Sequence, residues 1–175
     1  METRNAFRYN HMRIGPENLP NAALDNLEVN KKFIKLLKKR KPKRLDLLMQ
    51  DLHDEEFDQM DCLTCANCCK TTSPLFTDKD IASISKKLRM KEVDFVKNYL
   101  RMDEDGFMVL QSAPCTFLDD DNSCSIYEFR PKACREYPHT NRKKFLGIAD
   151  LTLKNAEICP AVFHILEELK KKLPL

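Results

Sequence analysis

Apolar residues recur at helical spacing through the first third of the chain, and this pattern predicts two helices. The first covers about residues 23–41 and ends before Pro42, because proline lacks a backbone donor and its ring blocks the preceding turn. The second covers about residues 44–60 and leads directly into a group of cysteines. Residues 1–22 are polar and contain two prolines, so we expect them to form an irregular N-terminal arm.

Short helices and short strands are predicted after the group of cysteines. Thr77 is expected to cap a helix, with Asp80 in the capping-box position. Residues 107–110 have the composition of a strand, and residues 115–118 form either its hairpin partner or a second short strand. Further helices are predicted at about residues 91–102, from Pro131 onwards, and at about residues 145–155 and 161–172. The predicted fold class is therefore mostly α with a few short strands.

Length and composition suit one small domain. The 175 residues are 42% apolar and 33% charged, which allows a modest core. No run approaches the ~18 apolar residues of a membrane helix, and residues 1–10 lack the apolar segment of a secretory signal. We therefore expect a cytoplasmic protein, whose thiols stay reduced. Residues 23–60 are predicted to form one globular unit with residues 61–175.

Eight cysteines are the main chemical feature of the sequence. Four lie within eight residues and four follow at longer intervals: Cys62, Cys65, Cys68 and Cys69, then Cys115, Cys124, Cys134 and Cys159. Several thiolates together select soft centres, namely zinc, copper(I) or iron–sulfur clusters. In the cytosol this favours metal ligation over a disulfide scaffold, which an even number of cysteines would also suit. We predict a domain wrapped around a cysteine-ligated metal centre, with burial as a small apolar side chain the alternative for Cys115.

The spacing of the first cysteines favours an iron–sulfur cluster, with the 4Fe-4S form preferred, over zinc. The run C-x2-C-x2-C matches three ligands of the bacterial ferredoxin motif, whose later cysteine precedes proline as in Cys159-Pro160. Zinc sites commonly combine two C-x2-C pairs at a distance from each other, and the sequence has no such second pair. On one helix the four clustered cysteines would share an arc of roughly 120°. In an extended chain Cys68 and Cys69 would face opposite sides and could serve two centres.

Two arginines flank one of the later cysteines. Arg130 and Arg135 lie on either side of Cys134 in the sequence. A thiolate-bound cluster has net negative charge, so nearby guanidinium groups would stabilise it and tune its potential. The alternative is that Arg130 caps or pairs locally with Glu128 or Glu136.

Two tyrosines and two histidines complete the candidate residues. Tyr127 and Tyr137 either donate hydrogen bonds near the metal centre or pack in the core. His139 is a weaker candidate ligand, because it follows the segment that carries Cys134. His164 lies in the last predicted helix beside an apolar residue, and we expect it to serve in packing.

A strongly basic segment lies far from the cysteines. Residues 31–44 contain nine Lys or Arg and no acidic residue. The segment is either the solvated face of an amphipathic helix or a docking surface for an acidic protein partner. Aromatic residues do not alternate with the charges, so nucleic acid is not the expected partner.

The order of motifs in the second half resembles the YkgJ-type cysteine-cluster family, also described as a zinc- or iron-chelating CxxCxxCC domain. The resemblance is carried by C-x2-C-x2-C-C at residues 62–69, P-C-x-F-L at 114–118, C-S-I-Y-E-x-R-P at 124–131, C-R-x-Y-P at 134–138 and C-P at 159–160. It covers about residues 61–160, and all eight cysteines of the pattern are present. It implies that these cysteines bind a metal or an iron–sulfur cluster.

Three functional hypotheses follow. The first is a cytosolic metal-binding protein with a redox or other metal-dependent role. The second is a small metal-dependent protein-modifying enzyme or oxidoreductase. The sequence has only three glycines and no glycine-rich loop after a strand, so a nucleotide site is not expected. The third is a zinc-stabilised adaptor that binds an acidic partner through residues 31–44.

Overall fold

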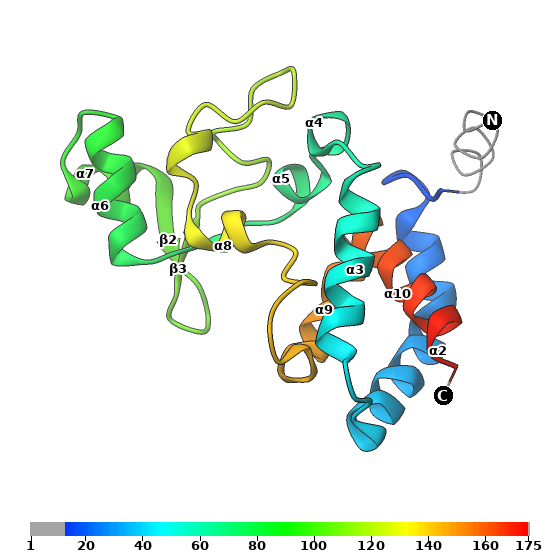
Figure 1. Cartoon of the computed structure of the whole chain (residues 1–175). Helices are drawn as coiled ribbons and strands as arrows, with labels where there is room; N and C mark the ends of the chain where they lie inside the picture. The colour runs from blue at the N-terminus through cyan, green and yellow to red at the C-terminus, as the bar shows by residue number, and fades with distance from the viewer. Residues whose placement is uncertain (1–12, 175) are drawn as a thin grey trace. The chain divides into compact units, whose positions relative to one another are not determined.

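Helices from the two ends of the chain pack together through their apolar faces. The computed structural model describes residues 13–174. One unit contains four helices and the short 3-10 helix η2 (Phe145–Gly147), and the four helices are α2 (Leu19–Arg40), α3 (Leu45–Phe57), α9 (Ala149–Ala156) and α10 (Pro160–Lys172). Figure 1 shows α2 and α3 from the N-terminal part of the chain beside α9 and α10 from its C-terminal part. This first unit comprises the described residues up to Asp61 and from Pro138 onwards.

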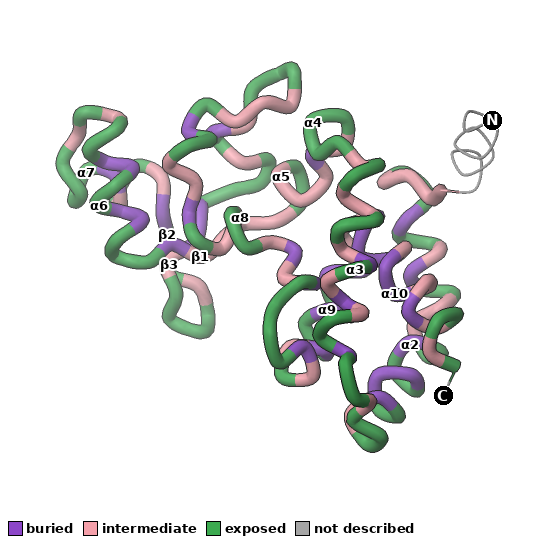
Figure 2. Tube along the Cα trace, in the orientation of Figure 1, coloured by how far each residue is buried: buried purple, intermediate pink, exposed green. Residues whose placement is uncertain are grey.

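The core of the first unit comes from the predicted apolar stripes. All these helices supply its fully buried members, which are Ile34, Leu37, Met49, Leu52, Phe145, Ala149, Ile165, Leu166 and Leu169. Figure 2 shows the buried stretches of α2, α3 and α10. Helix α2 begins at Leu19 rather than near residue 23, because Pro20 is accepted in the first turn of a helix. It ends at Arg40, just before the predicted end, where Lys41 adopts a left-handed conformation with φ 46°.

A polar network ties the segment before α2 to α3 and α10. The backbone N–H of Ile14 donates to His164 Nε2 at 3.0 Å, and His164 Nδ1 lies 3.1 Å from Glu56 Oε1. Arg13 forms an ion pair with the same Glu56 carboxylate. Because Nε2 accepts a hydrogen bond, it cannot carry a proton, and His164 is held as the neutral Nδ1–H tautomer. His164 therefore takes part in a polar network and also packs edge-on against Phe163.

The stability of the first unit is expected to fall in mild acid. Burial and, secondarily, the charge of Arg13 lower the pKa of His164 from 6.5 to about 4. The unfolded chain therefore binds one more proton between these values, and the stabilisation present above pH 6.5 is lost as pH falls towards 4. The full effect is about 3 kcal/mol. Urea unfolding across this range measures it.

The matched variant for this test is His164→Gln, which keeps a hydrogen-bond acceptor for Ile14 but cannot ionise. It should flatten the pH dependence without removing it, since burial also lowers the pKa of His53. Equal pH profiles for the wild type and the variant would show that His164 is not the responsible group.

The second unit, Cys62–Tyr137, contains a small antiparallel sheet covered by two helices. The strands β1 (Leu75–Phe76), β2 (Leu100–Met102) and β3 (Met108–Leu110) are ordered β1-β3-β2. Residues of the helices α6 (Asp78–Lys87) and α7 (Glu92–Tyr99) form the core of this unit. They pack together with Phe76 and Leu110 from the sheet and with Phe117 from the loop that follows it. The capping box predicted at Thr77 and Asp80 is present at the start of α6.

The strand pairing differs from both predicted alternatives for residues 115–118, which form no strand. Strand β3 pairs with β1 and β2, whereas residues 115–118 contribute only an isolated bridge between Leu118 and Cys124. The reason is the short turn between β2 and β3, in which Asp103 Oδ1 accepts the N–H groups of Asp105 and Phe107. The helix predicted over residues 91–102 ends at Tyr99, because the chain continues into β2.

The prediction of a mostly α fold with a few short strands is confirmed, since 58% of the structure is helical and its sheet has three strands. Within residues 13–174, no helix is long and apolar enough to cross a membrane.

Candidate metal centre

The clustered cysteines lie on two very short helices rather than on one. Helix α4 (Cys62–Cys65) and helix α5 (Asn67–Thr71) are separated by the single residue Ala66. Ala66 is 6% exposed and adopts a left-handed conformation with φ 47°. It therefore changes the direction of the chain between the second and third cysteines. The cysteine run is neither the single helix nor the extended chain that the sequence left open.

Backbone and side-chain hydrogen bonds join this run to the cysteines that follow. The N–H of Cys115 donates to the carbonyl of Cys69 at 2.8 Å. Asn122 Nδ2 donates to the carbonyl of Leu63 at 2.8 Å, which ties α4 to the turn before Cys124. The second unit thus brings together segments that are about fifty residues apart in the sequence.

Four thiols are close enough for their charges to act on one another. Burial and, secondarily, negative charge on Cys69, Cys115 and Cys124 raise the pKa of Cys134 to about 12. Burial likewise raises the pKa values of Cys115 and Cys124, and charge on Cys69 adds to both. In contrast, a hydrogen bond from the thiol of Cys68 lowers the pKa of Cys69 to about 7.

This donor set fits a soft metal cation. Negative charge on Cys69 opposes ionisation of the other three thiols, and a bound cation would remove that repulsion. The four thiols are Cys69, Cys115, Cys124 and Cys134, and they come from α5, two loops and α8 (Lys132–Glu136). No three Cys, His, Asp or Glu side chains of residues 13–174 are already arranged as a metal site. The side chains would therefore have to turn towards a common ion.

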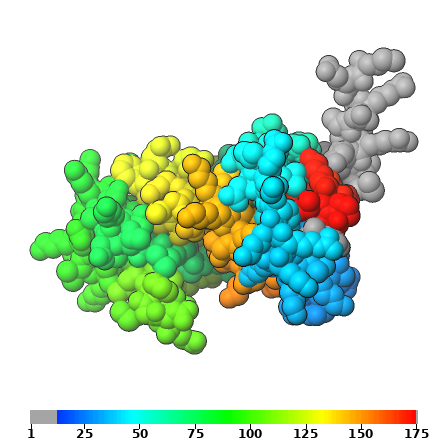
Figure 3. All heavy atoms as spheres, turned by 60° about the horizontal axis from the view of Figure 1, so that its bottom comes forward, coloured from blue at the N-terminus to red at the C-terminus, as the bar shows by residue number. Residues whose placement is uncertain are grey.

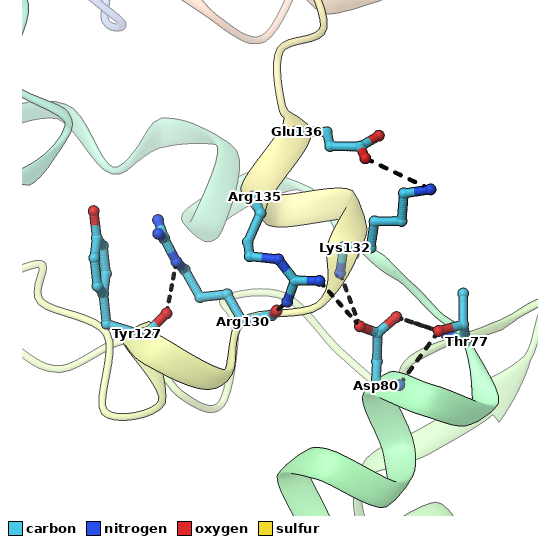
Figure 4. Close-up of polar contacts among 7 residues, drawn as sticks. All are labelled: Thr77, Asp80, Tyr127, Arg130, Lys132, Arg135 and Glu136. Carbon is cyan, nitrogen blue, oxygen red and sulfur yellow. Dashed lines mark hydrogen bonds and ion pairs between the residues drawn. The ribbon is translucent and has the colours of Figure 1, made fainter.

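Arg130 is a cation whose charge acts on three of these four thiols. Its charge lowers the pKa values of Cys69, Cys124 and Cys134, which opposes the effect of burial. Its position is set by Tyr127, because Arg130 Nε donates to the Tyr127 carbonyl at 2.8 Å and the guanidinium stacks 3.4 Å from the ring centroid (Figure 4). Among the described residues Arg130 forms no ion pair with Glu128 or Glu136, and its local contact is with the Tyr127 carbonyl. Tyr127 is 52% exposed and is not a core residue.

A buried carboxylate anchors the helix that carries Cys134. Asp80 is 5% exposed and accepts hydrogen bonds from the backbone N–H of Lys132 at 2.9 Å and from the Thr77 hydroxyl at 2.6 Å. Arg135 Nη2 lies 3.9 Å from the same carboxylate, and its Nη1 donates to the Arg130 carbonyl (Figure 4). Arg135 therefore fastens α8 to α6 and to Arg130. The sequence identified Asp80 only as a helix cap, since the contact to Lys132 spans 52 residues.

The remaining candidates are distributed over both units. Cys62 is exposed and Cys65 is half-buried, both on α4. Tyr137 is half-buried at the end of the second unit. Cys159 belongs to the first unit, where it precedes α10 and packs against an apolar cluster that includes Leu19 and Phe163. His139 is also part of the first unit and has a left-handed backbone with φ 67°.

Comparison with known proteins gives one match. No curated protein and no solved structure matches this chain. A family model named CxxCxxCC, with the description "Putative zinc- or iron-chelating domain", matches residues 61–160, which include all eight cysteines. Because this match covers more than half of the 175 residues, the chain belongs to the CxxCxxCC family of zinc- or iron-chelating domains.

Proposed function

We propose that this protein is a cytoplasmic metalloprotein whose second unit holds a 4Fe-4S cluster, with Cys69, Cys115, Cys124 and Cys134 as the ligands. The proposal is supported by the proximity of these four thiols, which come from separate segments of the chain but lie close enough for charge on Cys69 to raise the pKa of the other three. Four thiolates complete the ligand set of one such cluster. Cys62, Cys65, Cys68 and Cys159 stay candidate ligands on the strength of the sequence pattern.

Two further features support iron–sulfur chemistry over zinc. The sequence offers no second C-x2-C pair at a distance from the first, whereas zinc sites commonly combine two such separate pairs. Arg130 supplies positive charge beside the thiols, which would balance a cluster of net negative charge. When bound, the cluster would accept and release single electrons, whereas zinc is redox-inert. A closed four-thiolate site leaves no open coordination position, which favours electron transfer or a structural role over catalysis.

Metal and sulfide analysis of protein purified without oxygen tests the proposal. We expect about four iron and about four acid-labile sulfide per chain, a brown colour, and bleaching on reduction. Zinc without sulfide would overturn the iron–sulfur form and the redox role. A content of about two iron per chain would overturn the assignment of a 4Fe-4S cluster. Melting curves recorded before and after chelation complete the test, because metal-binding energy should contribute directly to folding of the second unit.

A further inference from the structure

The end of α2 and the loop that follows it carry a concentration of positive charge without ion-pair partners. Five bases of the segment 39–44 are exposed, and none forms an ion pair with any described residue: Lys39, Arg40, Lys41, Lys43 and Arg44. Two bases earlier in α2 do have partners, since Lys31 pairs with Glu28 and Lys38 pairs with Asp150. The charge at 39–44 is therefore not neutralised by the fold of the first unit.

A second basic segment, remote in sequence, is brought beside the first. Asp46, in the first turn of α3, accepts the backbone N–H of Lys144 at 2.7 Å and that of Phe145 at 3.0 Å. The three residues 142–144 are basic and exposed, and they too form no ion pair with described residues. We call residues 39–44 and 142–144 together the basic patch. Figure 3 shows the light blue and cyan surface around the end of α2 and the start of α3.

Helix stability accounts for only part of this charge. Cations in the last turn of a helix interact favourably with its dipole, which applies to Lys39 and Arg40. The other bases lie beyond the end of α2. Lys41 and Arg44 have left-handed backbones, and residues 142–144 belong to a separate loop. Their mutual repulsion is a cost to folding that no ion pair with a described residue offsets.

Apolar side chains are exposed next to the basic patch. Leu36 is 37% exposed and lies one turn before Arg40 on α2. Leu47 is 56% exposed and lies one turn after Arg44, at the start of α3. The aromatic residues of this region, Phe33 and Phe145, are buried and cannot stack on nucleic-acid bases. The surface thus combines positive charge with accessible leucines.

We propose that the basic patch binds an acidic segment of a partner protein that also carries apolar side chains. Carboxylates of the segment would neutralise the cations, and its apolar residues would cover Leu36 and Leu47. Such complementarity gives fast association and strong salt dependence. The proposal does not depend on the metal centre, because every residue in it belongs to the first unit.

Fluorescence anisotropy tests the proposal on the full chain, with a labelled peptide in which Glu and Leu residues alternate. The variant Lys39→Glu/Lys41→Glu/Lys43→Glu should weaken binding by about tenfold or more. The matched control is Lys79→Glu/Lys91→Glu/Lys97→Glu, which makes the same change in net charge at exposed lysines of the second unit. It should change affinity by less than about twofold.

Two further measurements decide between explanations. The neutral variant Lys39→Gln/Lys41→Gln/Lys43→Gln guards against unfolding by charge reversal, and it should also weaken binding. The variant Leu36→Ser/Leu47→Ser should bind the Leu-containing peptide more weakly than the wild type does. Its affinity for a peptide with Ser in place of Leu should be unchanged. Equal losses in the patch and control variants would overturn the proposal, as would absence of peptide binding. Tighter binding of duplex DNA or RNA than of the peptide would also overturn it.

Discussion

Replacing Cys134 with serine is expected to remove the metal centre and to lower the stability of the second unit. Cys134 is one of the four neighbouring thiols, and its pKa is raised to about 12, chiefly by burial. Loss of a residue that only orients a ligand costs 10–100-fold in metal affinity, so loss of a ligand should cost at least about 100-fold. At a fixed metal concentration near saturation this corresponds to about 2.7 kcal/mol less stabilisation. Metal content and urea unfolding under anaerobic conditions measure the two effects.

The same result is expected for serine at positions 69, 115 and 124, because each removes one of four ligands. Ala133→Ser is the matched control, since it introduces the same hydroxyl on the same helix without removing a sulfur. If Cys134→Ser and Ala133→Ser retain equal metal content, Cys134 is not a ligand. Cys159→Ala examines the prediction made for the eighth cysteine from the sequence. Metal loss in that variant would make Cys159 a ligand, and retention would leave it as part of the apolar cluster around Phe163.

Local features of the structure were predictable from the sequence. The capping box joins residues three positions apart, so Thr77 and Asp80 directly predict the start of α6. Helix α10 follows from the spacing of Ile165 and Leu169 and from a proline suited to its first turn. In each case the determining interactions lie within one or two helical turns.

Contacts between distant segments were not predictable. The strands have only two or three residues, so alternation of apolar and polar positions could not identify which strands pair. The sequence does not predict the break between α4 and α5 at Ala66, because alanine has no special preference for a left-handed backbone. For the candidate site, the spacing identified the thiols but not which of them lie near one another. That selection depends on hydrogen bonds such as the one from Cys115 to Cys69.

Removal of the Asp80 carboxylate is expected to have the second large effect. The Asp80→Ala variant loses the cap of α6 and leaves the Lys132 N–H and Arg135 without their shared acceptor. Truncating one member of a buried charged network costs roughly 3–5 kcal/mol, and loss of a cap alone about 1 kcal/mol. We expect destabilisation of about 3 kcal/mol, because Arg135 is partly exposed. Since α8 carries Cys134, metal affinity should also fall by about 10–100-fold.

The pH dependence of Asp80 gives an independent check. Burial alone would raise the pKa of Asp80, but hydrogen bonds from Thr77 and Lys132 and the charge of Arg135 outweigh burial and lower it below 3.8. The stabilisation is therefore present above pH 3.8 and is lost as pH falls through the lower, folded-state pKa. Asp80→Ala should lack this acid-dependent component.

Asp78→Ala is the matched control for Asp80, because it removes an exposed carboxylate from the same turn of α6. Its loss should cost less than about 1 kcal/mol, which is the size of a helix-dipole interaction at the surface. If Asp80→Ala destabilises the chain but keeps the metal affinity of Asp78→Ala, then Asp80 stabilises the fold without positioning Cys134. If both stability and metal affinity fall only in Asp80→Ala, the contact from α6 to α8 links folding of the second unit to the geometry of its thiols.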